Sequence, residues 1–252
     1  MDFTNGRIII FSGAGISAES GLATFRDGNG LWANYDPNIV CNYTNWHSNY
    51  KIVHKFYNQR REELKHTKPN IAHILTQKLS QEFEVINITQ NVDDFFERAY
   101  LEVNNVESSD FNAYSKADIL HLHGKLWELR CENCENITTI GYESYDFSPC
   151  KKCGNEILKP NIVFFYEQAP KYAIMYEIFD SIKDDDIIIV IGTSGEVVNI
   201  CAMLNRGYKI LNNLAQTRGI DENLFDSLYL EKSTEALPKI YNEIKNIKLY
   251  GI

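Results

Sequence analysis

The stretch that decides the fold is "RIIIFSGAGISAES", which occupies residues 7–20. Its first part, 7–11, is a short continuous apolar run of the kind that forms a buried strand. Gly13, Gly15 and Ala18 follow at once and satisfy the G-x-G-x-x-G/A spacing of dinucleotide-binding turns. In such turns, backbone N–H groups and a helix N-terminus meet a pyrophosphate. The stretch therefore predicts a phosphate-binding turn, although small-residue turns after buried strands are also common.

Apolar runs and helical patterns alternate along the rest of the chain. Further strands are expected at 84–89, 117–123, 162–165, 187–192 and 208–212, and helices at 53–64, 70–79, 171–182 and 237–247. This alternation predicts an α/β fold with a Rossmann-like, doubly wound and mainly parallel sheet. A helical insertion and a cysteine-rich segment interrupt it, and we expect them to form a smaller lobe. The expected single domain, 1–252, divides into a large lobe of 1–35, 81–125 and 158–252 and a small lobe of 36–80 and 126–157.

Composition and charge narrow the classes of partner. The formal net charge is -9, which argues against a general nucleic-acid binder because phosphate neutralisation needs a basic face. The longest strongly apolar run, Ile187 to Ile191, is far shorter than the roughly 20 residues that cross a bilayer. The N-terminus does not read as a secretory signal. We therefore expect no nucleic-acid or membrane partner and a cytoplasmic location. The sequence leaves the oligomeric state open, and a monomer is compatible with it.

Four of the six cysteines have the spacing of a zinc site. The pattern is C-x2-C-x15-C-x2-C, formed by Cys131, Cys134, Cys150 and Cys153. Two tight turns can present four thiolates to one tetrahedral ion. A pair of disulfides is the alternative, and it is weak without a secretion signal. Because all four ligands are cysteines, no coordination position stays open, and we expect one structural zinc ion.

Polar side chains collect where the predicted strands end. Gln90, Asn91 and Asp93 follow the second strand, at the edge where an open α/β sheet binds its ligands. Helix capping by Asn91 or Asp93 would explain one of the three. His123 ends the next strand and is a candidate general base, but His121 points to the same face and spacing does not separate them.

Two loops have a functional and a purely structural interpretation. The loop "GTSGEV", 192–197, could bind phosphate or ribose through its glycine and hydroxyl groups, but by itself it is a routine strand-end loop. The loop "GLATFRDGNGLW", 21–32, could be a flap over a bound cofactor. It could equally be a turn-rich surface loop with two buried aromatic residues.

The helix "VHKFYNQRREEL", 53–64, carries a charge on its apolar face. Val53, Phe56, Tyr57, Arg60 and Leu64 fall at spacings of three and four and so share one side. An inward guanidinium needs an anionic partner, because it keeps its charge in a protein. The alternative is that the Arg60 stem follows the apolar stripe and its charged end reaches water.

The segments "GAGISAESGLATFRDGNGLW", "TQNVDDFFERAY", "HLHG", the paired CxxC, "LKPNIVFFYE" and "GTSGEV" together resemble the sirtuin family of NAD-dependent protein-lysine deacylases. The resemblance extends from about Arg7 to about residue 240. It implies NAD as cosubstrate and acyl-lysine proteins or peptides as substrates. It also implies catalytic residues His123, rather than His121, with Asn91 and Asp93. The implied NAD site consists of Gly13, Ala14, Gly15, Phe25, Arg26, Gln90, Asn91, Asp93, Gly192, Thr193, Ser194 and Asn212.

The match "FYNQRR" further resembles the sirtuin branch that removes succinyl, malonyl and glutaryl groups. That branch implies substrate-binding roles for Tyr57, Arg60, Gly28, Val163 and Phe165, with deacetylation as a further activity. Departures from the family pattern at Phe96, Tyr166 and Asn199 affect peptide binding more than NAD chemistry. An NAD hydrolase or mono-ADP-ribosyltransferase on the same fold is an alternative function. A non-catalytic NAD sensor is another, although it would have no need of a base.

Overall fold

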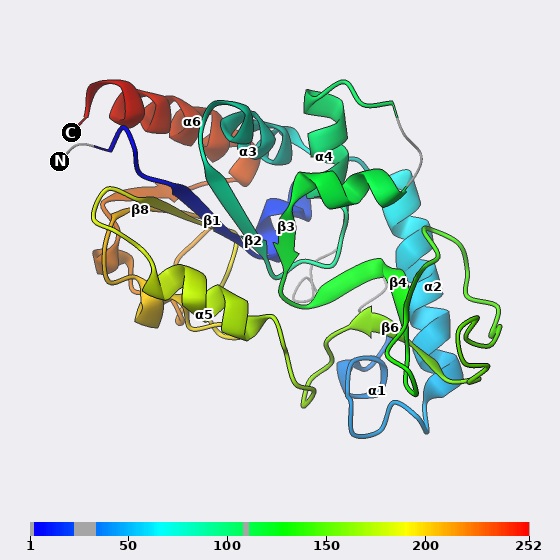
Figure 1. Ribbon diagram of the computed structural model, residues 1–252. Coiled ribbons are helices and arrows are strands. Elements are labelled where there is room, and N and C mark those ends of the chain that lie inside the picture. The colour runs from blue at the N-terminus through cyan, green and yellow to red at the C-terminus, as the bar shows by residue number, and fades with distance from the viewer. Residues whose placement is uncertain (1–2, 23–33, 108–110, 252) are drawn as a thin grey trace.

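The computed structural model describes residues 3–22, 34–107 and 111–251, and its largest element is a six-stranded sheet in which all neighbours are parallel (Figure 1). The strand order is β3 (Ile119–His121), β2 (Val85–Thr89), β1 (Ile8–Ser12), β7 (Ile187–Ile191), β8 (Tyr208–Asn213) and β9 (Ser227–Leu230). This is the order of the dinucleotide-binding doubly wound fold, so the predicted fold class is confirmed. The order reverses between β1 and β7, and the ends of these strands are where such folds bind their ligand.

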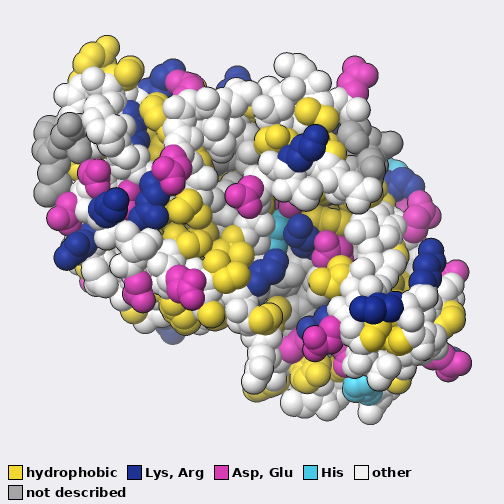
Figure 2. Space-filling view, viewed as in Figure 1, with side chains coloured by type: hydrophobic (Ala, Val, Ile, Leu, Met, Phe, Trp, Pro, Cys, Tyr) yellow, Lys and Arg dark blue, Asp and Glu magenta, His cyan; other side chains and the backbone are white. Residues whose placement is uncertain are grey.

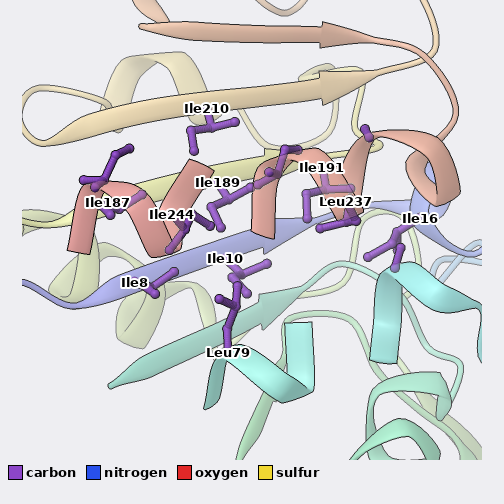
Figure 3. Packing of buried hydrophobic residues seen from close by; sticks show 14 of the residues in the cluster. Ile8, Ile10, Ile16, Leu79, Ile187, Ile189, Ile191, Ile210, Leu237 and Ile244 are labelled. Atoms are coloured by element: carbon purple, nitrogen blue, oxygen red, sulfur yellow. The ribbon is translucent and has the colours of Figure 1, made fainter. Parts of the chain in front are cut away.

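Helices cover both faces of this sheet. On one face, Ile8 and Ile10 pack in a cluster with Leu79 of α3 (Ile71–Glu82) and Leu237 of α6 (Ser233–Tyr250) (Figure 3). On the other face, Ile9 and Phe11 pack with α5 (Tyr172–Asp180). Successive residues of a strand point to opposite faces, so a strand covered on both sides is apolar throughout. The burial of all five residues in both β1 and β7 follows from this.

A second sheet lies beside the first and is antiparallel. Its order is β5 (Ile137–Thr139), β4 (Gly124–Cys131) and β6 (Leu158–Ile162). The helix α2 (Tyr50–His66) lies along it, and α1 (Pro37–Val40) lies near one end (Figure 1). Phe56 of α2 and Trp127 of β4 belong to the same buried cluster. Within the described ranges, the remaining helical elements are α4 (Phe95–Val103) and the short 3-10 turns η1 (Ala14–Ile16), η2 (Ala18–Ser20), η4 (Phe111–Ala117), η5 (Ile200–Met203) and η6 (Glu222–Leu224).

The four predicted helices are confirmed, but the strand predictions need two corrections. The strand predicted at 162–165 is wrong, because β6 ends at Ile162 and pairs with β4 rather than with the main sheet. Beyond it, the chain turns, and the N–H of Phe164 donates to the carboxylate of Glu167. The strand predicted at 117–123 is shorter, since the 3-10 turn η4 takes the residues up to Ala117. The strands β4 and β5 of the second sheet and the edge strand β9 were not predicted.

Two observations bear on the partners that the sequence predicts. Within the described ranges, none of the helices combines the length and apolar character that crossing a membrane requires. Acidic and basic side chains alternate over the face shown in Figure 2, and neither sign dominates it.

Candidate active site

The turn after β1 packs directly against the turn after β7. The N–H of Gly13 donates to the carbonyl of Ile191, and that of Gly15 donates to the carbonyl of Gly192, both at 2.9 Å. A Cβ atom at Gly15 would lie 2.6 Å from the Cα of Gly192, closer than atoms can approach. The glycines are thus required by contact between the two loops, and both their N–H groups are already used. In place of the long helix typical of this turn, the chain continues into η1 and η2.

Side-chain hydrogen bonds tie the loop after β7 to its neighbours in the sheet. Gln90, after β2, donates from Nε2 to the hydroxyl of Thr193 at 2.9 Å. The carbonyl of Thr193 accepts from the amide of Asn213, so the loop after β7 is linked to both β2 and β8. Ser194 lies in the same loop and accepts at its carbonyl from Thr217. The Asn212 side chain is fully buried and donates to the carbonyls of Tyr229 and Glu231, a structural contact that the sequence did not indicate.

Ser17 is the centre of a buried hydrogen-bond cluster that sequence reasoning missed. Its hydroxyl accepts from the amide of Asn91 and donates to the carboxylate of Asp93, both at 3.0 Å. His73 lies 3.3 Å away through Nε2. The backbone N–H of Asn70 donates to His73 Nδ1, so Nε2 carries the proton and donates to Ser17. All lone pairs and the proton of the Ser17 hydroxyl are therefore used. The position of Ser17 in the glycine turn was the only signal available.

Burial sets the charge state of Asp93. It raises the pKa of this carboxyl from 3.8 to about 6, while the Ser17 hydroxyl lowers it. The folded protein thus holds the proton more tightly than the unfolded chain does, and stability falls as the pH rises from about 4 to about 6. Above about pH 6, the buried charge of Asp93 lowers the free energy of unfolding by roughly 3 kcal/mol in total.

We therefore expect Asp93→Asn to stabilise the protein while impairing its activity. The amide keeps the shape of the side chain and its acceptor for Ser17 but removes the buried charge. Urea unfolding should give a gain of about 1–3 kcal/mol at pH 8, and the gain at pH 5 should be smaller by about 1 kcal/mol. A loss of stability at pH 8, or a gain independent of pH, would contradict a charged Asp93 in the folded protein.

The hydrogen bonds of His123 define which of its two ring nitrogens carries the proton. Its Nδ1 lies 2.9 Å from the carbonyl oxygen of Gln90 and its Nε2 lies 2.8 Å from the hydroxyl of Tyr172. A carbonyl oxygen only accepts, so Nδ1 carries the proton and Nε2 of the neutral ring is the acceptor. Burial lowers the pKa of His123, opposed by the Gln90 carbonyl. The ring is therefore neutral near pH 7 and able to take up a proton at Nε2.

His121 has a different role from His123. It is fully buried, and its Nε2 lies 2.7 Å from the carboxylate of Glu97. Its Nδ1 lies 2.9 Å from the carbonyl of Asn91. Both ring nitrogens thus face acceptors inside the protein, so neither is available to a bound ligand. Spacing alone left the two histidines equivalent, and the contacts separate them.

On α2, the arginine that is fully buried is Arg61 rather than Arg60. The guanidinium of Arg61 donates to the carbonyls of Leu126 and Glu143. The Arg60 side chain is 11% exposed, and its Nη1 donates to the carboxylate of Glu63 at 2.8 Å. Tyr57 is buried, and its hydroxyl lies 2.8 Å from the thiol of Cys41. Arg60 and Tyr57 remain one helical turn apart, as the spacing predicted.

The segment after β6 is held at its backbone. The N–H of Val163 donates to the carbonyl of His123. Phe165 exchanges backbone hydrogen bonds with Cys41 and Tyr43, which makes a short parallel bridge. Tyr166 follows and is 78% exposed. Its φ of 67° is a left-handed conformation that favours glycine. The sequence pattern had indicated that Tyr166 departs from glycine here.

The four cysteines form one cluster whose dimensions suit zinc. Their sulfur atoms all lie within 4.8 Å of one another. The Cys131 and Cys153 sulfurs are 3.6 Å apart, and those of Cys134 and Cys150 are 3.7 Å apart. Thiolates at Zn–S distances of about 2.3 Å on a tetrahedron would be separated by ~3.8 Å. The residues therefore fit one four-coordinate zinc ion, which would tie the two CxxC turns together without an open position for chemistry.

The two cysteine turns have the same local geometry. In each, the N–H of the residue after the second cysteine bonds to the carbonyl of the first: Glu135 to Cys131 and Gly154 to Cys150. Glu135 and Gly154 both have positive φ, at 55° and 74°. This tight turn aims both sulfurs of a CxxC pair to one side, which explains why the spacing alone predicted the cluster. Three predicted site residues, Phe25, Arg26 and Gly28, lie outside the described residues.

The fold and the site define an α/β protein of the dinucleotide-binding type with a candidate histidine base and a four-cysteine module, and comparison with known proteins narrows this class. Residues 13–199 match the Sir2 family. The "NAD-dependent protein deacylase" of Helicobacter hepaticus is 44% identical over 95% of this chain and 97% of its own length. A protein of the same description from Campylobacter jejuni is 41% identical, covering 97% and 98%. The chain belongs to the Sir2 family.

Solved structures agree with this assignment. A Sir2 homologue in complex with NAD is 28% identical to this chain, with a TM-score of 0.78, over 98% of this chain and 92% of its own. A mutant Sir2 homologue in complex with ADP ribose is 27% identical, with a TM-score of 0.80, over 99% and 96%. The likeness therefore covers both the parallel sheet and the segments inserted beside it.

Proposed function

We propose that this Sir2 protein is an NAD-dependent protein-lysine deacylase whose preferred acyl groups end in a carboxylate. The deacylase activity is supported by the family and by the names of its relatives. The observation that carries it is the neutral His123, with Nε2 as an acceptor, near the switch point of the sheet. NAD is the cosubstrate, and acyl-lysine side chains of proteins are the substrates.

In this reaction, the acyl oxygen attacks the anomeric carbon of the nicotinamide ribose. The new C–O bond replaces the C–N bond to nicotinamide, which leaves with the electron pair. His123 then takes a proton from a ribose hydroxyl at Nε2, so that the hydroxyl oxygen can attack the bound imidate. With water, this intermediate gives free lysine and O-acyl-ADP-ribose. The base acts only after nicotinamide has left, and that order makes the two halves of the reaction separable.

Asn91, Asp93 and Gln90 would surround the nicotinamide and its ribose. Ser17 ties Asn91 to Asp93, so the amide and the carboxyl are held before the cosubstrate arrives. Preorganised dipoles of this kind stabilise charge that develops in the transition state. The burial of Asn91 and Asp93 limits water near the electrophilic ribose carbon.

The preference for acidic acyl groups rests on Arg60. Its guanidinium already binds one carboxylate, that of Glu63, and the Glu63 side chain is 37% exposed. A carboxylate at the end of an acyl chain would replace Glu63 on the same fork. Tyr57, one turn earlier on α2, would exchange its contact with the Cys41 thiol for the same carboxylate. The site would thus be kept closed by internal partners until an acidic acyl chain displaces them.

We expect Arg60→Met to lower kcat/KM for a succinyl-lysine peptide by about 10- to 100-fold, the range for a lost hydrogen bond to a charged group. The rate on the matched acetyl peptide should change by less than threefold. Mass spectrometry of both peptides with NAD gives the two rates.

The matched control for this selectivity is Glu63→Gln. It removes the competing carboxylate and keeps Arg60, so succinyl turnover should be retained or increased. Equal succinyl and acetyl rates that Arg60→Met leaves unchanged would refute the acidic-acyl preference. A deacylase without that preference would still consume NAD with the acetyl peptide, so the two parts of the proposal are tested separately.

NAD hydrolysis or mono-ADP-ribosyl transfer is the second candidate. Tyr166 favours it, because a large exposed side chain with a left-handed backbone stands beside the segment where a substrate strand is expected. Nicotinamide release at the same rate with and without peptide would support this candidate. If no nicotinamide were released under any condition, the remaining function would be NAD sensing.

A further inference from the structure

A tyrosine hydroxyl from the helix α5 is hydrogen-bonded to Nε2 of the candidate base, His123. The Tyr172 hydroxyl lies 2.8 Å from His123 Nε2, and the two rings are tilted by 44° with centroids 5.9 Å apart. Because the Gln90 carbonyl fixes the proton on Nδ1, the Nε2 lone pair is the acceptor and the phenol is the donor. The nitrogen that would take the ribose proton is therefore hydrogen-bonded within the protein itself.

The tyrosine is held on a rigid support. It is the first residue of α5, and Met175 and Phe179 follow it at spacings of three and seven, on the same side of the helix. Both of these residues are buried, and the Phe179 ring packs edge-on against Phe11 of β1. The hydroxyl is thus aimed at His123 by a helix that is anchored in the main core, not by a surface loop.

We propose that Tyr172 is a positioning residue for the base: its hydroxyl holds the His123 imidazole in the Nδ1–H tautomer and occupies Nε2 until a ribose hydroxyl of the cosubstrate replaces it. The inference rests on the proposed deacylase reaction for its last step only. The tautomer and the hydrogen bond involve this chain's own residues and can be measured without turnover.

Two properties follow from the contact. A hydrogen bond donated to the neutral ring favours that form and disfavours the imidazolium. Burial also raises the pKa of the Tyr172 phenol, so the phenol stays protonated and remains a donor over the working pH range. Tyr172 therefore adds to the effect of burial and keeps His123 unprotonated at lower pH than burial alone would.

The first arm of the test is nitrogen NMR of histidine-labelled protein without ligand. The chain has six histidines, and the His123 signals are those absent from His123→Asn. In the natural protein, they should report a neutral ring protonated at Nδ1. In Tyr172→Phe, the pKa of His123 should rise by about 0.5 to 1, the range for the loss of one hydrogen bond. An unchanged pKa and tautomer would overturn the proposal, whatever the activity of the protein.

The second arm compares the pH dependence of kcat/KM for deacylation. For Tyr172→Phe, the acidic limb should move to higher pH by the same amount, giving a loss that reaches about three- to tenfold at pH values below the pKa of His123 in both proteins. At pH 8.5, where the base is neutral in both proteins, the rates should agree within threefold. Equal losses at both pH values would indicate a general structural defect and would count against the positioning role.

Tyr176→Phe is the matched control. Tyr176 lies one turn further along α5, is 49% exposed, and packs near Tyr172 with ring centroids 6.4 Å apart. Two lysines lie nearby in the chain, Lys125 two residues after His123 and Lys171 directly before Tyr172. His121, two residues before His123, pairs with Glu97. These groups are unchanged in both variants, so their influence on His123 is the same when Tyr172→Phe is compared with Tyr176→Phe. A pKa shift of equal size in Tyr176→Phe would refute a specific role for Tyr172.

Discussion

Replacing His123 by asparagine should lower kcat for deacylation by about 10²- to 10⁴-fold, the usual contribution of a general base. The asparagine amide can still donate to the Gln90 carbonyl, which His123 Nδ1 contacts at 2.9 Å, but it offers no basic nitrogen at the position of Nε2. The loss should therefore fall on the step that removes the ribose proton. The release of lysine from an acyl peptide, followed by mass spectrometry, measures it.

The same variant should still exchange bound nicotinamide with labelled nicotinamide in solution. In the proposed order of steps, the acyl oxygen attacks and nicotinamide leaves before the base acts, so this half of the reaction does not need His123. Exchange within about tenfold of the natural rate, together with lost deacylation, is the expected pair of results. Deacylation that stays within tenfold of the natural rate would remove His123 from the mechanism.

Replacing Cys150 by serine should remove the zinc ion and destabilise the cysteine module. Cys150 is buried beside Cys134 and its sulfur is one of the four in the cluster. In isolated zinc-finger peptides, the binding of structural zinc contributes ~10–16 kcal/mol, and only part of this is expected here because β4 and β6 also hold the module. A loss of about 3–5 kcal/mol corresponds to a fall in Tm of roughly 10 °C.

The zinc content should change from one ion per chain to none, as measured by metal analysis. Proteolysis should then cut first between residues 131 and 157, where the turns have lost their common anchor. Cys201→Ser is the matched control, because Cys201 is half-buried in η5 and is not part of the cluster. Retention of one zinc ion by Cys150→Ser, with unchanged Tm, would contradict the four-cysteine site.

Much of the fold was accessible from local patterns. The continuous apolar runs of β1 and β7 predicted buried parallel strands, and the structure has both. The CxxC spacing predicted the sulfur cluster because each pair is shaped by one tight turn. The strand predicted at 162–165 was wrong because its outcome depended on a distant partner. The residue pattern did not show that β6 would pair with β4 and that the chain would turn after Ile162.

The sequence by itself determined the main helices, the buried parallel strands, the sheet class, the zinc quartet and the presence of polar groups at the strand ends, because these depend on contacts within a few residues. Residue spacing did not separate neighbouring candidates, and the tertiary structure distinguishes them by their contacts. His121 turns to Glu97 while His123 meets Tyr172, which is 49 residues away. Arg61, rather than Arg60, is fully buried. Such choices depend on which distant element packs against each side chain, and residue spacing along one strand or helix cannot encode that packing.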